Sequence, residues 1–167
     1  MTAAKDSVAT QQLFITHLFD APREWVFLAW TDPEQLMQWY APGDCTITFS
    51  TIDVRPNGHF HSCVHDPLHG DCWMRGVYRE IRFPEKLVFS MVLSNAAGDV
   101  LAPDETGKPG DWPVEIITTV FFTSVGQQTQ IALHQTVPEK LAKQTGAYQS
   151  WLKMFSKLSA VFKNLKK

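Results

Sequence analysis

The sequence lacks a long apolar run and an apolar leader. No stretch approaches the roughly 18 apolar residues that a transmembrane helix needs. The opening letters MTAAKDSVATQQ are polar, unlike the apolar segment of a secretion signal. From these two absences we expect a cytoplasmic protein that does not enter a membrane.

Glycine is also scarce, and its nine residues are scattered. The spacings GxGxxG, GxxxxGK and GxSxG are missing, which argues against a dinucleotide site, a nucleotide-phosphate loop and a serine nucleophile. The three cysteines, Cys45, Cys63 and Cys72, cannot all pair within the chain, and their spacings match no zinc motif. The sequence therefore predicts no cofactor, no resident metal ion and reduced thiols.

Charge of one sign is not in excess, because 15 Lys and Arg stand against 17 Asp and Glu, and the pI is near 6.3. The distribution is uneven, however. Residues 139–167 hold seven lysines and one acid and so carry a net charge of +6. Because the whole chain carries −2, residues 1–138 carry −8. We expect a basic helix face that docks on the protein's own acidic body, the alternative being a nucleic-acid or anionic-membrane patch. The pI disfavours nucleic acid, and we expect neither partner.

The residues that are present describe one globular domain. Of the 167 residues, 44% are hydrophobic and 12% are aromatic, which is typical of a packed core and not of a disordered chain. The length is ordinary for one domain. We predict a single domain over residues 1–167, with residues 1–11 as a flexible leader.

The periodicity of apolar residues predicts an α+β fold. An alternating strand over Leu13–Phe19 leads into two short helices between Asp20 and Pro42, because the prolines at positions 22 and 33 mark helix starts. From Cys45 the period changes to two, which indicates antiparallel strands joined by turns, about six or seven strands in all. The later strands are expected at 45–54, 59–66, 72–82, 87–94, 114–123 and 129–137.

The last segment has the pattern of a long amphipathic helix. After Pro138, apolar side chains recur at spacings of three and four residues over about five turns. They are Tyr148, Trp151, Phe155, Leu158, Phe162 and Leu165. Because one apolar helix stripe packs on one apolar sheet face, we predict a helix-grip arrangement, in which a curved antiparallel sheet wraps around this C-terminal helix. The loop Asn95–Pro113 is expected to border an opening.

Four segments together resemble one protein family. They are FDAPREWVFLAWTDPEQLMQWYAP from Phe19, DVRPNG from Asp53, GVYREIRFPEKLVF from Gly76 and SWLKMFSKL from Ser150. In this order they are similar to the START-like (SRPBCC) superfamily, in its bacterial branch of homologues of the activator of the heat shock protein 90 ATPase. The chain departs from the family at two positions. Asn57 replaces the first glycine of an Arg-Pro-Gly-Gly turn, and Ser150 stands where many members carry glycine.

The resemblance implies a cavity between the sheet and the long helix, where relatives on this fold bind lipids, sterols, plant hormones or polyketides. The candidate lining residues for a small hydrophobic or aromatic ligand are Trp39, Met74, Tyr78, Glu80, Phe89, Met91, Phe121, Tyr148, Trp151 and Phe155. Aromatic stripes of this kind are also typical of a simple core. Both interpretations stay open at this point.

Tyr78 and Glu80 are the polar candidates for the cavity. They share a strand face opposite Arg75 and Arg79, so they point inward if the arginines face water. A buried glutamate would then have a raised pKa and could orient a ligand. In the alternative, Glu80 reaches solvent and pairs with an arginine. One carboxylate without a partner does not make a catalytic site, and we assign no catalytic residue.

His59, His61, Cys63 and His65 occupy alternate positions of one predicted strand. Imidazole and thiolate groups on one face could bind zinc or copper. The intervening Phe60 suits the core, however, which would place the histidines outward, and ligands along one straight strand diverge. We therefore expect an outward polar or oligomer-contact face without metal, with a pH-sensitive role as a further alternative.

Three functional hypotheses remain. The leading one is a binding module that holds a small hydrophobic or aromatic molecule between the C-terminal helix and the sheet. The second is a chaperone-linked protein-interaction module, as the resemblance implies. The third is a cyclase-type or hydrolase-type enzyme that uses Tyr78, Glu80 or a histidine as acid or base. Exposed strand edges and the histidine face would also suit a homodimer.

Overall fold

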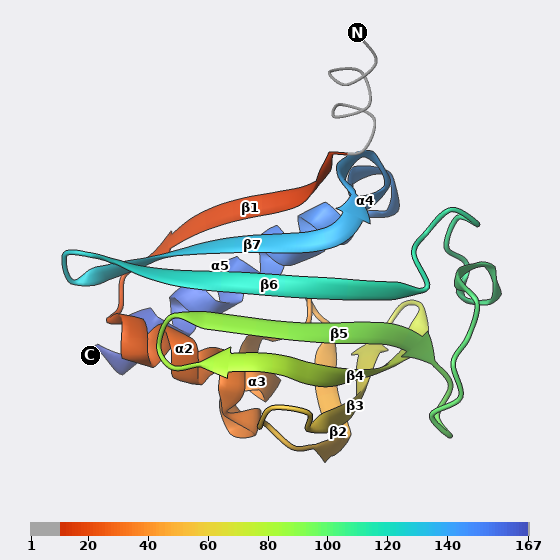
Figure 1. Cartoon of the computed structure of the whole chain (residues 1–167), viewed down its shortest axis with the longest axis horizontal. Helices are drawn as coiled ribbons and strands as arrows, with labels where there is room; N and C mark the ends of the chain where they lie inside the picture. Colours follow the sequence, from red (N-terminus) through yellow and green to blue (C-terminus); the bar gives the residue numbers. More distant parts are fainter. Residues whose placement is uncertain (1–10, 167) are drawn as a thin grey trace, which may run out of the picture.

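The computed structural model describes residues 11–166 and contains one antiparallel sheet packed on a long C-terminal helix (Figure 1). The seven strands have the order β1-β7-β6-β5-β4-β3-β2. The strands are β1 (Gln12–Phe19), β2 (Thr46–Ile52), β3 (His59–Asp66), β4 (Gly70–Arg82), β5 (Lys86–Ser94), β6 (Glu115–Val125) and β7 (Gln128–Pro138). The helices are α2 (Arg23–Thr31), α3 (Pro33–Trp39), the 3-10 turn η1 (Pro103–Thr106), α4 (Glu139–Thr145) and α5 (Ala147–Leu165). The predicted α+β helix-grip fold is confirmed.

Proline and aspartate determine where the two short helices begin. Pro22 directly precedes α2, and Pro33 opens α3, at positions where a helix does not need the missing amide hydrogen. The Asp32 side chain accepts a hydrogen bond from the Glu34 amide at 3.2 Å and so caps α3. The two helices lie between β1 and β2 in the chain, as the sequence predicted.

The C-terminal helical segment is divided in two, which the sequence pattern did not predict. Gly146 adopts the left-handed conformation with φ 86°, which ends α4 because residues with a Cβ rarely adopt it. The helix resumes at Ala147 and runs through α5. The buried stripe of α5 comprises Trp151, Met154, Phe155, Leu158 and Phe162. Tyr148 is only half-buried and Leu165 is exposed, so the covered stripe is shorter at both ends than expected.

Strand β4 comes close to its neighbours at Gly76. Phe60 of β3 is paired with Gly76 in the sheet register, and its ring lies across this glycine. A Cβ atom at Gly76 would lie 2.1 Å from the Ser90 carbonyl oxygen and 2.4 Å from the Phe60 ring. The ring centroid of Phe60 lies 5.5 Å from that of Tyr78 and 6.1 Å from that of Phe89. Glycine thus makes room for this aromatic group.

The basic C-terminal helix contacts the body of the protein through two lysines. The Lys157 ammonium donates to the carbonyl oxygens of Ala41 at 2.5 Å and Cys45 at 3.2 Å. Lys166 pairs with Asp20 at 3.0 Å. Part of the basic charge therefore docks on the protein itself, as the sequence predicted.

The two ends of the chain are described to different extents. The leader predicted for residues 1–11 lies outside the described residues except at Gln11, whose carbonyl accepts a hydrogen bond from the Glu139 amide at 2.9 Å. Among residues 11–166, no helix combines the length and the apolar character that crossing a lipid bilayer requires.

Lowering the pH from about 6.5 toward 5 is expected to destabilise the fold through His17. Its imidazole lies 4.5 Å from the Phe19 ring and 5.3 Å from the Phe155 ring, measured between centroids. Burial among these rings lowers the pKa of His17 below its ordinary value of 6.5. The unfolded chain therefore binds a proton more readily than the folded one, so the free energy of unfolding falls as the pH drops from about 6.5 toward the lowered folded-state pKa.

Urea unfolding of the wild type and of His17→Phe at pH 7 and pH 5 measures this effect. The variant should lose less stability over the interval than the wild type. His134→Gln is the matched control, because His134 hydrogen-bonds Gln12 at the exposed side of β7, and it should retain the wild-type pH dependence. The same pH dependence in His17→Phe and the wild type would contradict the prediction.

Candidate functional site

A cavity of about 220 Å³ lies between the beginning of α5 and the part of the sheet where β5 ends and β6 begins. Its walls are mainly apolar. They include Val64, Met74, Met91, Ile116, Trp151 and Met154. The cavity thus lies between the sheet and the long helix, where the family resemblance implies one.

The other half of the space between helix and sheet is filled by aromatic rings. Trp30 packs on Trp39 with their centroids 4.8 Å apart and on Trp151 at 5.9 Å. Next to them, Tyr78 and Phe89 border a remaining gap of only about 20 Å³. At the open half, the rings of Tyr40, Trp112 and Trp151 share the wall with methionines and small side chains. Methionine adapts its shape readily to what it contacts.

Gln135 is a buried polar group in the cavity wall. Its Oε1 accepts a hydrogen bond from the Trp151 indole at 3.0 Å, and its Nε2 donates to the Thr118 hydroxyl at 3.0 Å. These bonds hold the amide and orient the indole. A primary amide has two donor hydrogens and two acceptor lone pairs, so Gln135 can still bind one polar group of a ligand.

Tyr40 and Lys108 add a hydroxyl and a positive charge to the wall. Burial raises the pKa of Tyr40, and the nearby Tyr78 adds to the rise, so the Tyr40 hydroxyl remains a hydrogen-bond donor at neutral pH. The Lys108 ammonium lies over the Trp112 ring, 4.9 Å from its centroid. Lys108 and Trp112 both belong to the loop Asn95–Pro113, so this loop borders the opening, as the sequence predicted. Figure 1 shows the loop where it joins β5 to β6.

The structure separates the predicted lining residues into two groups. Those in the wall of the cavity are Met74, Met91 and Trp151. Those in the closed aromatic core are Trp39, Tyr78, Phe89 and Phe155. Tyr148 lies half-buried near the start of α5 with the Lys143 ammonium 5.3 Å from its ring centroid, and it does not line the cavity.

Two predicted lining residues point away from the cavity. A register shift between Tyr78 and Glu80 interrupts the alternation of β4, so Tyr78 and Ile81 face the core while Glu80 turns outward. Glu80 pairs with Arg82 at 2.5 Å and Lys86 at 3.1 Å, and hydrogen bonds from these two cations lower the pKa of its carboxyl. The alternative solvent-exposed placement of Glu80 is therefore the one that the structure shows.

Phe121 is the second correction. The inward positions of β6 are Ile116, Thr118, Val120 and Phe122, and strict alternation places Phe121 on the opposite face. Its side chain is exposed, with the Lys86 ammonium 5.3 Å from the ring centroid. Of the two adjacent phenylalanines, Phe122 is buried and Phe121, the predicted lining residue, faces outward.

Sequence reasoning missed Gln135, Met154 and Lys108. Gln135 follows Ile131 and Leu133 on the inward face of β7, so a polar residue in an apolar alternation was an available signal. Met154 stands three residues after Trp151, which is also helical spacing. Lys108 lies in an irregular loop, for which periodicity gives no signal.

The histidine strand lies on the face of the sheet that points away from α5, because Phe60 is in the core and Val64 lines the cavity. His61 belongs to β3, next to the edge strand β2, and lies on this outer face. Its Nδ1 is 2.9 Å from the Ser50 hydroxyl, and its Nε2 is 3.2 Å from the Ser94 hydroxyl. The imidazole also packs on Trp73 at a centroid distance of 4.8 Å. This imidazole is therefore hydrogen-bonded through both nitrogens.

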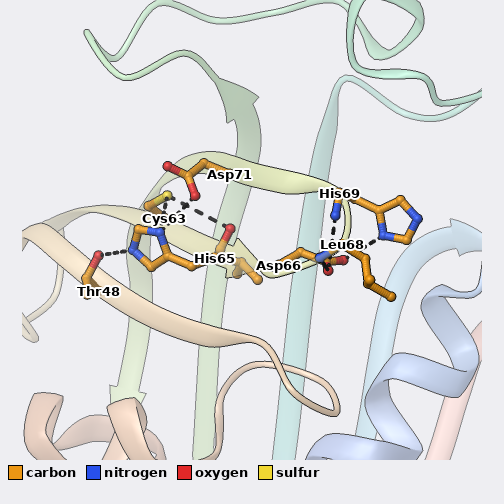
Figure 2. Close-up of polar contacts among 8 residues, drawn as sticks. Thr48, Cys63, His65, Asp66, Leu68, His69 and Asp71 are labelled. Atoms are coloured by element: carbon orange, nitrogen blue, oxygen red, sulfur yellow. Dashed lines mark hydrogen bonds and ion pairs between the residues drawn. The ribbon is translucent and has the colours of Figure 1, made fainter.

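A second polar cluster on the outer face comprises Cys63, His65 and Asp71, with Thr48 beside it (Figure 2). His65 Nδ1 lies 2.9 Å from Asp71 Oδ1 and 3.7 Å from Cys63 Sγ. Burial raises the pKa of the Cys63 thiol, and the Asp71 carboxylate adds to the rise. Asp71 belongs to β4 and was not among the residues that the sequence analysis grouped with the histidines.

The sequence matches a family model described as Activator of Hsp90 ATPase homolog 1-like protein over residues 20–163. That range includes α2, α3, the sheet from β2 to β7 and most of α5. A comparison with curated protein sequences gives no match.

Solved bacterial structures share the fold. A solution structure of a protein from Arthrobacter aurescens has a TM-score of 0.79 at 20% identity and covers 94% of this chain and 88% of that one. For a protein from Staphylococcus epidermidis the TM-score is 0.77 at 20% identity, with 95% and 92% covered. A crystal structure of an AHSA1 protein from Silicibacter pomeroyi has a TM-score of 0.72 at 15% identity, with 93% and 99% covered. At these identities the similarity concerns the fold alone.

Proposed function

Because the chain belongs to the family of Activator of Hsp90 ATPase homolog 1-like proteins, we propose that it is a binding module for a small aromatic molecule. The ligand would enter the cavity between α5 and the sheet. The observation that carries this proposal is the combination of a hollow apolar half and a densely filled aromatic half within one core. Empty space in a core reduces the free energy of unfolding. A cavity of this size therefore favours a binding role over a purely structural one.

The size of the cavity limits the ligand to about one or two rings. Its volume of about 220 Å³ exceeds the roughly 150 Å³ of an apolar cavity that accommodates benzene. It lies below the roughly 300 to 1,000 Å³ of pockets that enclose drug-sized molecules. An indole or naphthalene ring system fits this interval, whereas a sterol or a long lipid chain is too large.

The expected affinity follows from the area removed from water. A bicyclic ring buries about 200 Å², comparable to a buried tryptophan side chain, which contributes about 5 kcal/mol at roughly 25 cal/mol per Å². Part of this gain is offset by the lost freedom of the ligand. Dissociation constants of about 0.2 mM or weaker are therefore expected for neutral bicyclic compounds.

The polar groups of the wall favour a ligand with an anionic substituent. Lys108 supplies a positive charge in the loop that borders the opening, and Gln135 and Tyr40 supply neutral hydrogen-bonding groups. A carboxylate on the ring would reach Lys108 while the ring remains among the methionines. We therefore expect an aromatic carboxylate to bind more tightly than the same ring without its carboxylate, and Lys108→Met to remove this difference.

Filling the cavity is expected to prevent binding. Ser150 of α5 lines the cavity, so the indole of Ser150→Trp should occupy the ligand space and weaken the binding of 2-naphthoate at least tenfold. Ser156 of the same helix is exposed, and Ser156→Trp is the matched control. Isothermal titration calorimetry of the wild type and both variants measures the effect.

The result would contradict the proposal if Ser150→Trp bound 2-naphthoate as tightly as Ser156→Trp did. Thermal unfolding of both variants shows whether each is folded before the titration. If no aromatic compound bound the wild type, the alternative of a chaperone-linked interaction module would become the better hypothesis. Its test is direct binding to an Hsp90-class chaperone, which Ser150→Trp should leave unchanged.

A further inference from the structure

The cluster Cys63, His65 and Asp71 combines three types of metal ligand on the outer face of the sheet. Cys63 and His65 are alternate residues of β3, and Asp71 is the cross-strand partner of His65 on β4. One ligand atom from each lies within 4.8 Å of the other two. The atoms therefore converge on one point between the strands, as Figure 2 shows.

Residues of β3 alone do not form a metal site. Ligands along one strand diverge, because alternate side chains are about 6 to 7 Å apart. Here the third ligand comes from the neighbouring strand, and Cys63 and His65 incline toward each other until Sγ and Nδ1 are 3.7 Å apart. The β3–β4 pairing thus provides the convergence that a single strand lacks.

The distances are close to those of a zinc centre. Zinc binds cysteine sulfur at about 2.3 Å, histidine nitrogen at about 2.0 Å and carboxylate oxygen at about 2.0 to 2.2 Å. With tetrahedral angles, sulfur and nitrogen are about 3.5 Å apart, and nitrogen and oxygen about 3.3 Å. The observed separations are 3.7 Å for Sγ to Nδ1 and 2.9 Å for Nδ1 to Oδ1. Small side-chain movements bring all three onto one ion.

We propose that Cys63, His65 and Asp71 bind one Zn²⁺ ion. The ion replaces the protons now shared within the cluster: the Cys63 thiol loses its hydrogen, and His65 Nδ1 presents a lone pair. Thiolate and carboxylate together carry two negative charges, which balance the charge of the ion. Such neutralisation is required at a position as buried as Cys63, whose side chain is inaccessible to solvent.

Thr48 is a positioning residue for this site. Its hydroxyl lies 2.9 Å from His65 Nε2, the nitrogen that faces away from the other two ligands. Metal-bound histidines commonly donate their second N–H to an oxygen, which determines the tautomer and the ring orientation. With Nε2–H donating to Thr48, Nδ1 is unprotonated and directed toward Cys63 and Asp71.

The fourth position of the ion faces solvent. The side chains of His65 and Asp71 are 39% and 54% exposed, so water can reach the ion from the outer face. Structural zinc sites have four protein ligands, whereas three protein ligands leave one exchangeable position. We infer a site that takes up and releases zinc reversibly, and the fold does not depend on it. The cavity on the other face is separate, so this site stands without the proposed function.

Metal titration of the reduced protein tests the proposal. With Co²⁺ as a spectroscopic substitute, the wild type should give a thiolate-to-cobalt charge-transfer band at one ion per chain. Cys63→Ser should remove the band and weaken zinc binding about 100-fold, measured against a competing chelator. Asp71→Asn changes an exposed side chain, so it keeps the fold, and should weaken binding at least tenfold. Thr48→Val should weaken it about 10- to 100-fold.

Two matched variants control for other ligands. Cys72 is the next residue after Asp71 but lines the cavity on the other face, so Cys72→Ser should keep the cobalt band. His69 pairs with Asp66 outside the cluster, so His69→Gln should keep it as well. The proposal is overturned if the wild type shows no cobalt–thiolate band, if the band survives Cys63→Ser, or if Asp71→Asn binds zinc with unchanged affinity.

Discussion

Replacing Trp151 by alanine is expected to reduce the free energy of unfolding by about 3 to 5 kcal/mol, as large core truncations do. The Trp151 indole is buried and stacks on Trp30 at a centroid distance of 5.9 Å. It also donates a hydrogen bond to Gln135 Oε1 at 3.0 Å. Truncation leaves this buried amide without its partner, and an unsatisfied buried acceptor costs about 1 to 3 kcal/mol. The expected loss therefore lies in the upper part of the range.

Denaturant titration of Trp151→Ala, Trp151→Phe and Trp25→Ala separates these contributions. Trp151→Phe keeps most of the ring packing but removes the indole donor, so its loss should fall between the wild type and Trp151→Ala. Trp25 on α2 is 41% exposed and serves as a matched control, with a loss below about 1 kcal/mol. A similarly small loss for Trp151→Ala would show that the packing of α5 described above is wrong.

Gly76→Ala is expected to destabilise the protein by about 3 kcal/mol or more, at the upper end of what overpacking a core costs. The added methyl group would lie 2.1 Å from the Ser90 carbonyl oxygen of β5 and 2.4 Å from the Phe60 ring of β3. A side chain can rotate away, but the carbonyl belongs to the paired strand. The β4–β5 pairing must therefore separate locally to accept one methyl group.

Gly110→Ala is the matched control for this prediction, because a Cβ atom there meets nothing within 4 Å and its φ is not positive. It should leave the denaturation midpoint nearly unchanged. The double variant Phe60→Leu with Gly76→Ala relieves the ring contact and leaves the carbonyl contact, so it should recover only part of the loss. If Gly76→Ala were as stable as Gly110→Ala, the close approach of β4 to β5 would be disproved.

The fold was largely predictable because its elements have strong periods. The alternation in β1, β3 and β7 and the three-and-four spacing from Trp151 to Phe162 gave the order and the type of these elements. The family resemblance added the helix-grip topology. The break at Gly146 is not indicated by the apolar spacing, because a left-handed glycine acts through the backbone and not through a side chain.

The candidate site was predictable only in part, since its details depend on single-residue register. Because of one register shift between Tyr78 and Glu80, the Glu80 carboxylate, which was predicted to contact a ligand, lies on the outer side of β4. The hollow half of the core is lined by Met74, Met91 and Met154. How much of the space these side chains fill depends on their rotamers, which the sequence pattern does not specify. The Cys63–His65–Asp71 cluster required the pairing of β3 with β4, which a pattern within one strand does not contain.

The pairing of β1 with β7 has a consequence for how this chain folds during its synthesis. Leu13 is aligned with Gln135, which lies 122 residues later in the chain. At roughly 5 to 20 residues per second, a ribosome needs about 6 to 24 s to produce the chain between these two positions. Until then β1 has no partner strand, and the helices that follow it can form before it does. Contacts this distant in sequence also slow the final folding step, so β1 is synthesised before its partner β7 and is among the last strands to join the sheet.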